Sequence, residues 1–154
     1  MPLNIFTPAQ QICMIAIMDR IIPENDFPSA SAAGVLNYIE TLLTLEETLQ
    51  SELVFGLEAF NRLCVIKSGS HFSKLSDEAQ DAFLKACLSG SLRDEDQTVT
   101  LAPDLKEFVD LCIRLVSEGY YADPVNGGNR DSVSWNMIGF HVTDADLTAT
   151  GGLV

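Results

Sequence analysis

The side chains that most often perform catalysis are scarce in this sequence of 154 residues. A Ser-His-Asp or Cys-His arrangement would need His71 or His141, which are the two histidines of the chain. Neither has a recognisable nucleophile context such as Gly-x-Ser-x-Gly. A small hydrolase or metal enzyme would require one of them to converge with a carboxylate or a cysteine in a pocket. We therefore predict no catalytic residue and no metal site in this chain.

The four cysteines have the spacing of core residues. The chain contains no Cys-x-x-Cys pair for zinc and no Cys-x-x-Cys-His for covalent haem. Each cysteine has apolar neighbours at helical spacing, and a free cysteine behaves as a small buried hydrophobe. We expect reduced core thiols at Cys13, Cys64, Cys87 and Cys112.

Loops that could hold an ion lack the details that such loops need. Residues 94–96 and 144–146 each carry two aspartates, but they lack the glycine and the distal glutamate of a calcium loop. Residues 127–130 have the composition of a phosphate loop, yet Asp123 and Asp131 on either side would repel an anion. Since no Gly-x-Gly-x-x-Gly and no Walker sequence is present, we expect no cofactor in this chain.

Nine basic residues face twenty-two acidic ones and give a formal charge of −13. Proteins that bind nucleic acid draw their affinity from Lys and Arg on phosphates, so this balance excludes nucleic acid as a partner. A basic patch on a partner protein is the natural complement. The alternative is that the charge serves solubility alone, and composition leaves both interpretations open.

The most apolar run, residues 12–18, is far shorter than the ~20 residues that cross a bilayer, so we expect no membrane span. The first basic residue, Arg20, follows this run instead of preceding it, unlike in a secretory signal. We therefore expect a cytoplasmic location. The alternative is a periplasmic location, if an export signal was removed or is carried by a partner.

Helical patterns begin at the amino terminus. Thr7 is a predicted N-cap, with Pro8 at the first helical position and Gln10 able to reach back to the cap. This helix should reach about Ile22, be stopped by Pro23, and lie buried at the centre of the fold, because it is apolar almost all round. Residues 23–31 combine two prolines with turn residues and predict an ordered loop.

Four further apolar stripes predict four more helices. We expect a second helix from about residue 34 to 50 and a third that ends near residue 68. A fourth should run from 76 to 90, and a fifth from 105 to a stop at Gly119. The fold is therefore an all-α, single-domain bundle of about five helices, with an ordered C-terminal loop and short helix. Residues 1–142 form the domain, and residues 143–154 form a tail that is loose unless a partner holds it.

The segment 119–140 holds the single Trp and two of the three Tyr. Asp123-Pro124 and Gly127-Gly128 predict a specific turn, and Asp131 can cap a short helix that carries Trp135. Aromatic residues with Arg on a shaped loop are typical of protein-binding hot spots. The alternative is that Trp135 and Tyr121 only pin the loop onto the bundle. The candidate partner-binding residues are Tyr120, Tyr121, Asp123, Pro124, Gly127, Gly128, Asn129, Arg130, Asp131, Trp135, Met137 and Phe140.

This segment resembles the small subunit, often called subunit 3, of the gluconate 2-dehydrogenase family of membrane-linked flavoprotein dehydrogenases. The residues that carry the resemblance are Gly119 to Pro124, Gly127 to Asp131, Trp135, and Met137 to Phe140. A second match near the start consists of Asp19 to Pro23, Pro28, Ala30, Ala33 to Val35, and Tyr38-Ile39. The middle of the chain agrees only in its helical character.

The resemblance implies a chain that is no enzyme by itself. It implies a non-catalytic partner of a large FAD-containing subunit of the glucose-methanol-choline type, which oxidises a sugar, sugar acid or polyol. That large subunit would pass electrons to a cytochrome c, a quinone or a dye, and the small subunit would assist its folding, stability or export. The alternative is a free-standing, chaperone-like helical protein that engages a flavoprotein client transiently.

Three features depart from the family pattern. Members commonly begin with a twin-arginine export signal, which this sequence does not show. Asn126 stands where an aromatic residue is usual, and His141 stands where proline is common. The compartment and the details of the loop contacts are therefore expected to differ from those of typical members.

Overall fold

The computed structural model describes residues 5–90, 92, 105–122 and 128–129. All regular structure within these ranges is helical, so the predicted all-α, single-domain bundle of about five helices is confirmed. The predicted tail, and the predicted short helix around Trp135, lie outside the described residues. The elements are α1 (Pro8–Ile21), α2 (Val35–Leu45), α3 (Glu47–Ser68), the 3-10 turn η1 (Phe72–Lys74), α4 (Asp77–Ser89) and α5 (Leu105–Tyr121).

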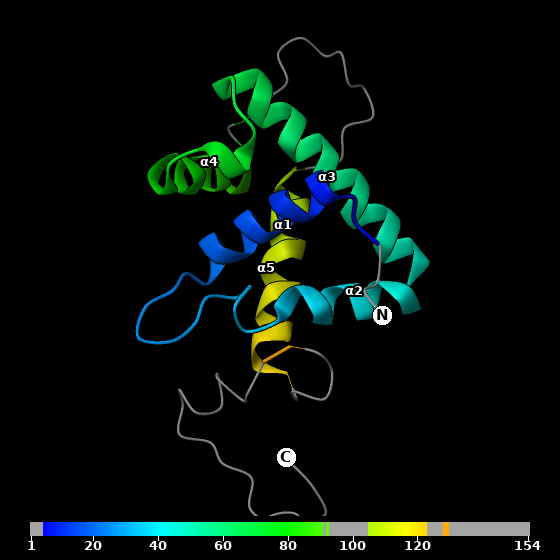
Figure 1. Ribbon diagram of the computed structural model, residues 1–154. Helices are drawn as coiled ribbons and strands as arrows, with labels where there is room; N and C mark the ends of the chain where they lie inside the picture. The colour runs from blue at the N-terminus through cyan, green and yellow to red at the C-terminus, as the bar shows by residue number, and fades with distance from the viewer. Residues whose placement is uncertain (1–4, 91, 93–104, 123–127, 130–154) are drawn as a thin grey trace, which may run out of the picture.

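The helix at the centre of the bundle is α5. It contacts each of the other four α-helices, and Figure 1 shows it running behind α1 with α2 beside its carboxyl end. The sequence placed α1 at the centre. Helix α1 does bury Cys13, Met14, Ile17 and Met18, but Ile12 is 56% exposed. An apolar stripe that continues over the whole length of α5 gives that helix the wider set of neighbours.

Local signals set several helix ends as predicted. Thr7 and Gln10 form a reciprocal capping box, with the Gln10 amide donating to Thr7 Oγ1 over 3.2 Å and the Thr7 amide donating to Gln10 Oε1 over 2.9 Å. Ser76 Oγ accepts from the Ala79 amide at the start of α4. Gly90 ends that helix with a φ of 72°, a left-handed conformation that glycine adopts without strain.

Two other helix boundaries differ from prediction. The second helix stops at Leu45, because Glu46 takes an extended conformation and α3 begins at the next residue. This bend lets the stripes of α2 and α3 face one core. Helix α5 continues through Gly119 to Tyr121, because Gly119 is a packing position and not a helix stop. A Cβ at Gly119 would lie 2.8 Å from the Tyr38 ring and 3.0 Å from Val35.

The core toward the amino end of α5 contains a cluster of four phenylalanines. The Phe60 ring lies 4.9 Å from Phe72, 5.0 Å from Phe83 and 5.5 Å from Phe108, measured between centroids. All four side chains are buried. Since edge-on aromatic pairs add to the hydrophobic stabilisation of burial, this cluster joins α3, η1, α4 and α5.

The loop between α1 and α2 is ordered, as predicted. Asp19 accepts two hydrogen bonds from Ser31, one from its amide over 2.8 Å and one from its hydroxyl over 2.6 Å. The Ala30 amide donates to the Ile22 carbonyl. Arg20, the next residue along α1, forms a bidentate ion pair with Asp81 of α4. Its Nε and Nη2 atoms each donate to a carboxylate oxygen over 2.9 Å. The end of α1 therefore holds both the loop and α4.

Candidate partner interface

His71 lies in a structural hydrogen-bond network. The Asn61 side-chain amide lies 2.9 Å from His71 Nδ1, and Asn61 Oδ1 accepts from the Phe72 amide over 3.0 Å. Within the described part of the chain, no three His, Cys, Asp or Glu side chains come close enough together to hold a metal ion. His141 lies outside that part. Cys13 and Glu58 border the same groove as His71. Glu58 accepts a hydrogen bond from the Gln10 side-chain amide, and the Cys13 thiol is buried, with its pKa raised to about 12.

All four cysteines are buried, which confirms their predicted place in the core. Burial, with a smaller contribution from the nearby Cys64, raises the pKa of Cys13 and of Cys87 to about 12. Burial also raises the pKa of Cys64 and of Cys112. Because the thiolate is the nucleophile and the metal ligand, thiols that stay protonated at neutral pH are chemically inert here.

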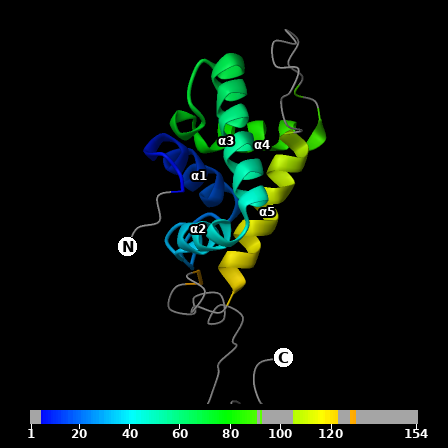
Figure 2. The same cartoon turned by 90° about the vertical axis from the view of Figure 1, so that its right-hand side faces the viewer.

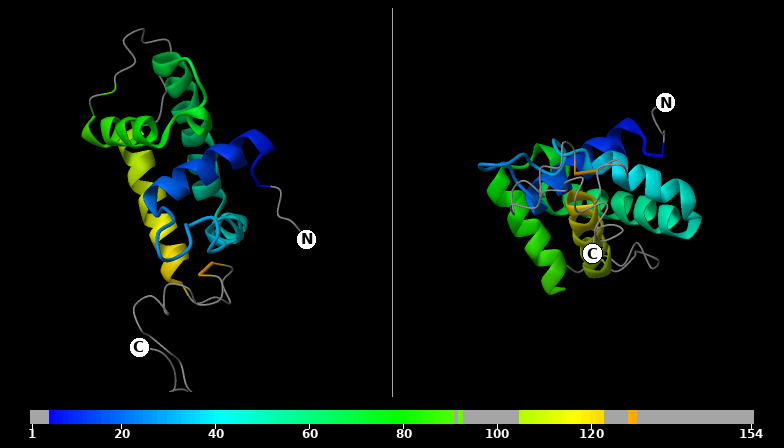
Figure 3. Two further views of the ribbon diagram at one scale, coloured as in Figure 1. Left: turned by 60° about the vertical axis from the view of Figure 1, so that its left-hand side comes forward. Right: turned by 90° about the horizontal axis from the view of Figure 1, so that it is seen from below.

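The structure brings together the two segments that carry the resemblance, although they lie near opposite ends of the sequence. Gly119 of α5 is covered by Val35 and Tyr38 of α2. The view from below in Figure 3 shows α2 beside the carboxyl end of α5. Tyr38 is partly buried, and its pKa is raised by that burial and then by the charge and hydrogen bond of Glu118. One end of the bundle is thus built from both segments.

Tyr120 connects this end to the loop between α1 and α2. Its hydroxyl donates to the Pro28 carbonyl over 2.9 Å, and the side chain is only 1% exposed. Burial raises the pKa of Tyr120, and the neighbouring Tyr121 adds to the shift. A residue buried this deeply cannot contact a partner directly, so Tyr120 positions the surface around it.

Gly128 and Asn129 fold back against the end of α5. A Cβ on Gly128 would clash with the carbonyl oxygen of Gly119 and would lie 3.0 Å from the Cβ of Tyr38, so only glycine fits. Asn129 has a φ of 48° and is fully buried, and its side-chain amide donates to the Ala122 carbonyl over 2.7 Å. These two residues therefore fix where the chain returns to the bundle.

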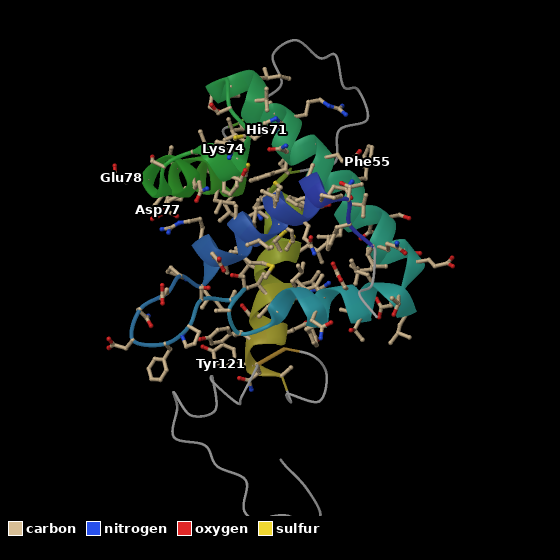
Figure 4. All side chains as sticks on the ribbon, in the orientation of Figure 1. Phe55, His71, Lys74, Asp77, Glu78 and Tyr121 are labelled. Carbon is tan, nitrogen blue, oxygen red and sulfur yellow. The ribbon has the colours of Figure 1, made fainter. Side chains whose placement is uncertain are left out.

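Tyr121 is the exposed aromatic at this end. It is 47% exposed, and its ring packs edge-on against Tyr120 with centroids 5.3 Å apart. Figure 4 shows it at the carboxyl end of α5. Exposed aromatic side chains that a buried neighbour holds in place are typical of protein-binding surfaces.

Four of the twelve candidate partner-binding residues are thereby placed: Tyr120, Tyr121, Gly128 and Asn129. The contributions of Pro28, Tyr38 and Glu118 were not predicted as part of a site. Their signal in the sequence was weak, because Tyr38 reads as one more residue of an apolar stripe. The other eight candidates lie outside the described residues: Asp123, Pro124, Gly127, Arg130, Asp131, Trp135, Met137 and Phe140.

Several large apolar side chains remain about half exposed or more elsewhere on the bundle. Exposed apolar side chains mark a binding surface where they form a contiguous patch. In the described residues, no helix is both long enough and apolar enough to span a bilayer. The exposed side chains other than Tyr121 are Ile12, Leu45, Phe55 and Ile66.

Comparison with known proteins agrees with the resemblance. The family model described as gluconate 2-dehydrogenase subunit 3 matches residues 8–141, a range that runs from α1 past the end of α5. Neither a curated protein nor a solved structure matches the chain.

Proposed function

Because the chain belongs to the gluconate 2-dehydrogenase subunit 3 family, we propose that it is the non-catalytic small subunit of an FAD-dependent dehydrogenase complex. Its role is to bind a large flavoprotein subunit of the glucose-methanol-choline type and to stabilise or mature it. The large subunit holds the FAD and oxidises a sugar, sugar acid or polyol. A cytochrome c or another electron-transfer subunit accepts the electrons, and the chain shares the compartment of its flavoprotein.

The observation that carries this proposal is the convergence of the two family-like segments at one end of the bundle. Val35 and Tyr38 seat Gly119, while Pro28 anchors Tyr120, and the result is a rigid base that presents Tyr121. The other candidate residues are covalently tied to this base on both sides of Gly128-Asn129. A rigid base lowers the entropy that is lost when a partner binds, which favours a protein interface.

The chemistry of the described side chains supports a binding role. Within the described residues, the cysteine thiols are buried with raised pKa values and His71 Nδ1 contacts the Asn61 amide, so these side chains have structural roles. In contrast, half-exposed aromatic and aliphatic side chains are typical of surfaces that a permanent partner covers.

The test is co-expression of the tagged chain with the large flavoprotein subunit of the same organism. The tag is used for purification, and the eluate is measured for flavin absorbance and for sugar dehydrogenase activity. We expect a yellow, active complex. Tyr121→Ala, Arg130→Ala and Trp135→Ala should each weaken it by about tenfold or more, which is the size of effect that hot-spot residues have.

Ile12→Ala is the matched control, because Ile12 is about as exposed as Tyr121 but lies on α1. This variant should retain the flavoprotein. A colourless eluate that contains the chain alone would instead favour a chaperone-like protein that meets its client transiently. If Ile12→Ala weakens the complex as much as Tyr121→Ala does, the carboxyl end of α5 is not the preferred binding surface.

A further inference from the structure

A groove between α3 and α5 shares no residue with the interface at the carboxyl end of α5. Figure 2 shows α3 and α5 side by side. The groove between them has a volume of about 510 Å³. Apart from Arg114, its lining consists of apolar side chains and acids. The apolar ones are Phe55, Phe108 and Leu111, and the acids are Glu52, Glu107 and Asp110.

The floor of this α3–α5 groove is fixed before any partner arrives. Gly56 lets the Phe108 ring approach the α3 backbone, because a Cβ at this position would clash with the ring. Phe108 also packs on Phe60 in the aromatic cluster and is 4% exposed. Phe55, one residue before Gly56, is 51% exposed at the side of the groove. A fixed apolar floor beside an exposed aromatic residue can receive an apolar anchor.

The charge around the groove is mostly negative. Asp110 pairs with Lys106 over 3.0 Å, whereas Glu52 and Glu107 form no ion pair within the described residues. Among the described residues, Arg114 is the one cationic side chain that lines the groove. On a chain with a net charge of −13, such a rim repels a second copy of the same chain and attracts a basic segment.

We propose that the α3–α5 groove is a second docking site for the large flavoprotein subunit, and this inference rests on the proposed function. It receives a segment in which an apolar side chain is flanked by Lys or Arg. The apolar side chain packs on Phe55 and Leu111, which Phe108 supports from below, and the basic ones pair with Glu52 and Glu107. The small subunit thus contacts its partner at two separate surfaces.

A second groove, between α1 and α3, lacks these properties and supplies the control. Its charged residues, Glu58 and Arg62, are of opposite sign. The Gln10 side-chain amide already donates to Glu58 over 2.8 Å. Ile66, which also lines this groove, is 54% exposed and belongs to α3 like Phe55. Phe55 and Ile66 are therefore matched in helix and exposure and differ in the groove that they border.

The experiment measures binding of the purified chain to the immobilised large subunit on a biosensor. Phe55→Ala should lower the affinity by about tenfold or more, and Ile66→Ala should not. The double variant E52Q/E107Q should slow association about three- to tenfold at low salt. The matched double variant E46Q/E78Q, with the same net charge, should leave it unchanged.

Salt separates the electrostatic contribution from the apolar one. Raising NaCl from about 0.1 M to about 1 M shortens the Debye length from about 10 Å to about 3 Å, which should abolish the effect of E52Q/E107Q. The effect of Phe55→Ala should persist at both concentrations. Far-UV circular dichroism of each variant checks that its helices are intact. Because E52Q/E107Q changes only exposed side chains, it tests the groove without altering the core.

The outcomes distinguish this inference from the proposed function. If Phe55→Ala binds like Ile66→Ala and E52Q/E107Q binds like E46Q/E78Q, the groove is no docking site, even though Tyr121→Ala still weakens the complex. If the wild-type chain does not bind the large subunit at all, both the proposed function and this inference are wrong.

Discussion

The two ends of the bundle are held together by different kinds of contact. Toward the amino end of α5, four phenylalanine rings join the helices, with Phe60 within 5.5 Å of three others. At the carboxyl end, glycines bring backbones together and hydrogen bonds fix the approach, as between Tyr120 and Pro28. The first end gains its stability from buried apolar area, and the second gains a defined geometry.

The two ends should therefore differ in how well their residues tolerate substitution. Apolar cores tolerate swaps that conserve volume, since shape can be recovered by repacking. Gly128 has no such freedom, because a Cβ there would clash with the carbonyl oxygen of Gly119. Of the resembling residues that the structure describes, Tyr38, Gly119 and Gly128 pack together at this second end. We infer that the first end serves the fold and the second serves the interface.

Of the substitutions that test this comparison, Phe60→Ala should have the largest effect. Removing the central ring of the cluster should lower the free energy of unfolding by about 3–5 kcal/mol, which is usual for a buried phenylalanine. Urea unfolding followed by far-UV circular dichroism measures this. The fraction that remains folded should bind the large subunit normally. A folded variant that binds tenfold more weakly would contradict the division of roles between the two ends.

Gly128→Ala should weaken binding of the large subunit more than it destabilises the fold. Its Cβ would push residues 128–129 away from α5, so binding of the large subunit should fall about tenfold, equivalent to about 1.4 kcal/mol. The free energy of unfolding should change less than for Phe60→Ala. Gly69→Ala is the control, because Gly69 has a φ of 79° with open space around it. That control should cost about 1 kcal/mol of stability through backbone strain and leave binding intact.

Tyr120→Phe tests the hydrogen bond that closes the second end. Without its hydroxyl the Pro28 carbonyl loses a partner, and we expect a loss of about 1 kcal/mol. Hydrogen exchange should become faster in residues 22–34, while α4 keeps its protection. Unchanged exchange in the loop would mean that Asp19 and Ser31 hold it without help from α5.

Glu40→Gln should have the smallest effect. Glu40 of α2 is buried, and burial raises its pKa above the ordinary value of 4.5. The folded state therefore prefers the neutral carboxyl, so its stability decreases as pH rises from 4.5 through the raised pKa. The glutamine variant should be more stable at neutral pH, by less than about 1 kcal/mol. Thermal unfolding at several pH values should show this gain disappear below pH 4.5, and a gain that persists in acid would contradict the assignment.

Much of the fold was predictable because its signals are local. Thr7, Pro8 and Gln10 mark the start of α1, and Ser76 and Gly90 mark both ends of α4, since caps act within one turn of a helix. The break at Glu46 was not predictable in this way. Neither glycine nor proline stands there, and the bend serves the packing of α2 and α3 on a common core.

The error at Gly119 also obscured part of the site. Glycine after an apolar stripe usually ends a helix, but here it makes room for Tyr38. Had the stripe been continued past Val116, its spacing of four would have placed Tyr120 in the core and Tyr121 outside. The composition of residues 119–140 was enough to predict that they bind a partner. Only the packing of α2 on α5 showed which of its residues face inward.

The contact between Tyr120 and Pro28 joins residues 92 positions apart, which has a consequence for the newly made polypeptide. At about 5–20 residues per second, the ribosome needs roughly 5–20 s to extend the chain from one to the other. Throughout that interval the Pro28 carbonyl has no Tyr120 to accept from. This end of the bundle therefore closes only after the end of α5 has been synthesised, later than the contacts within α1, α2 and α3 can form.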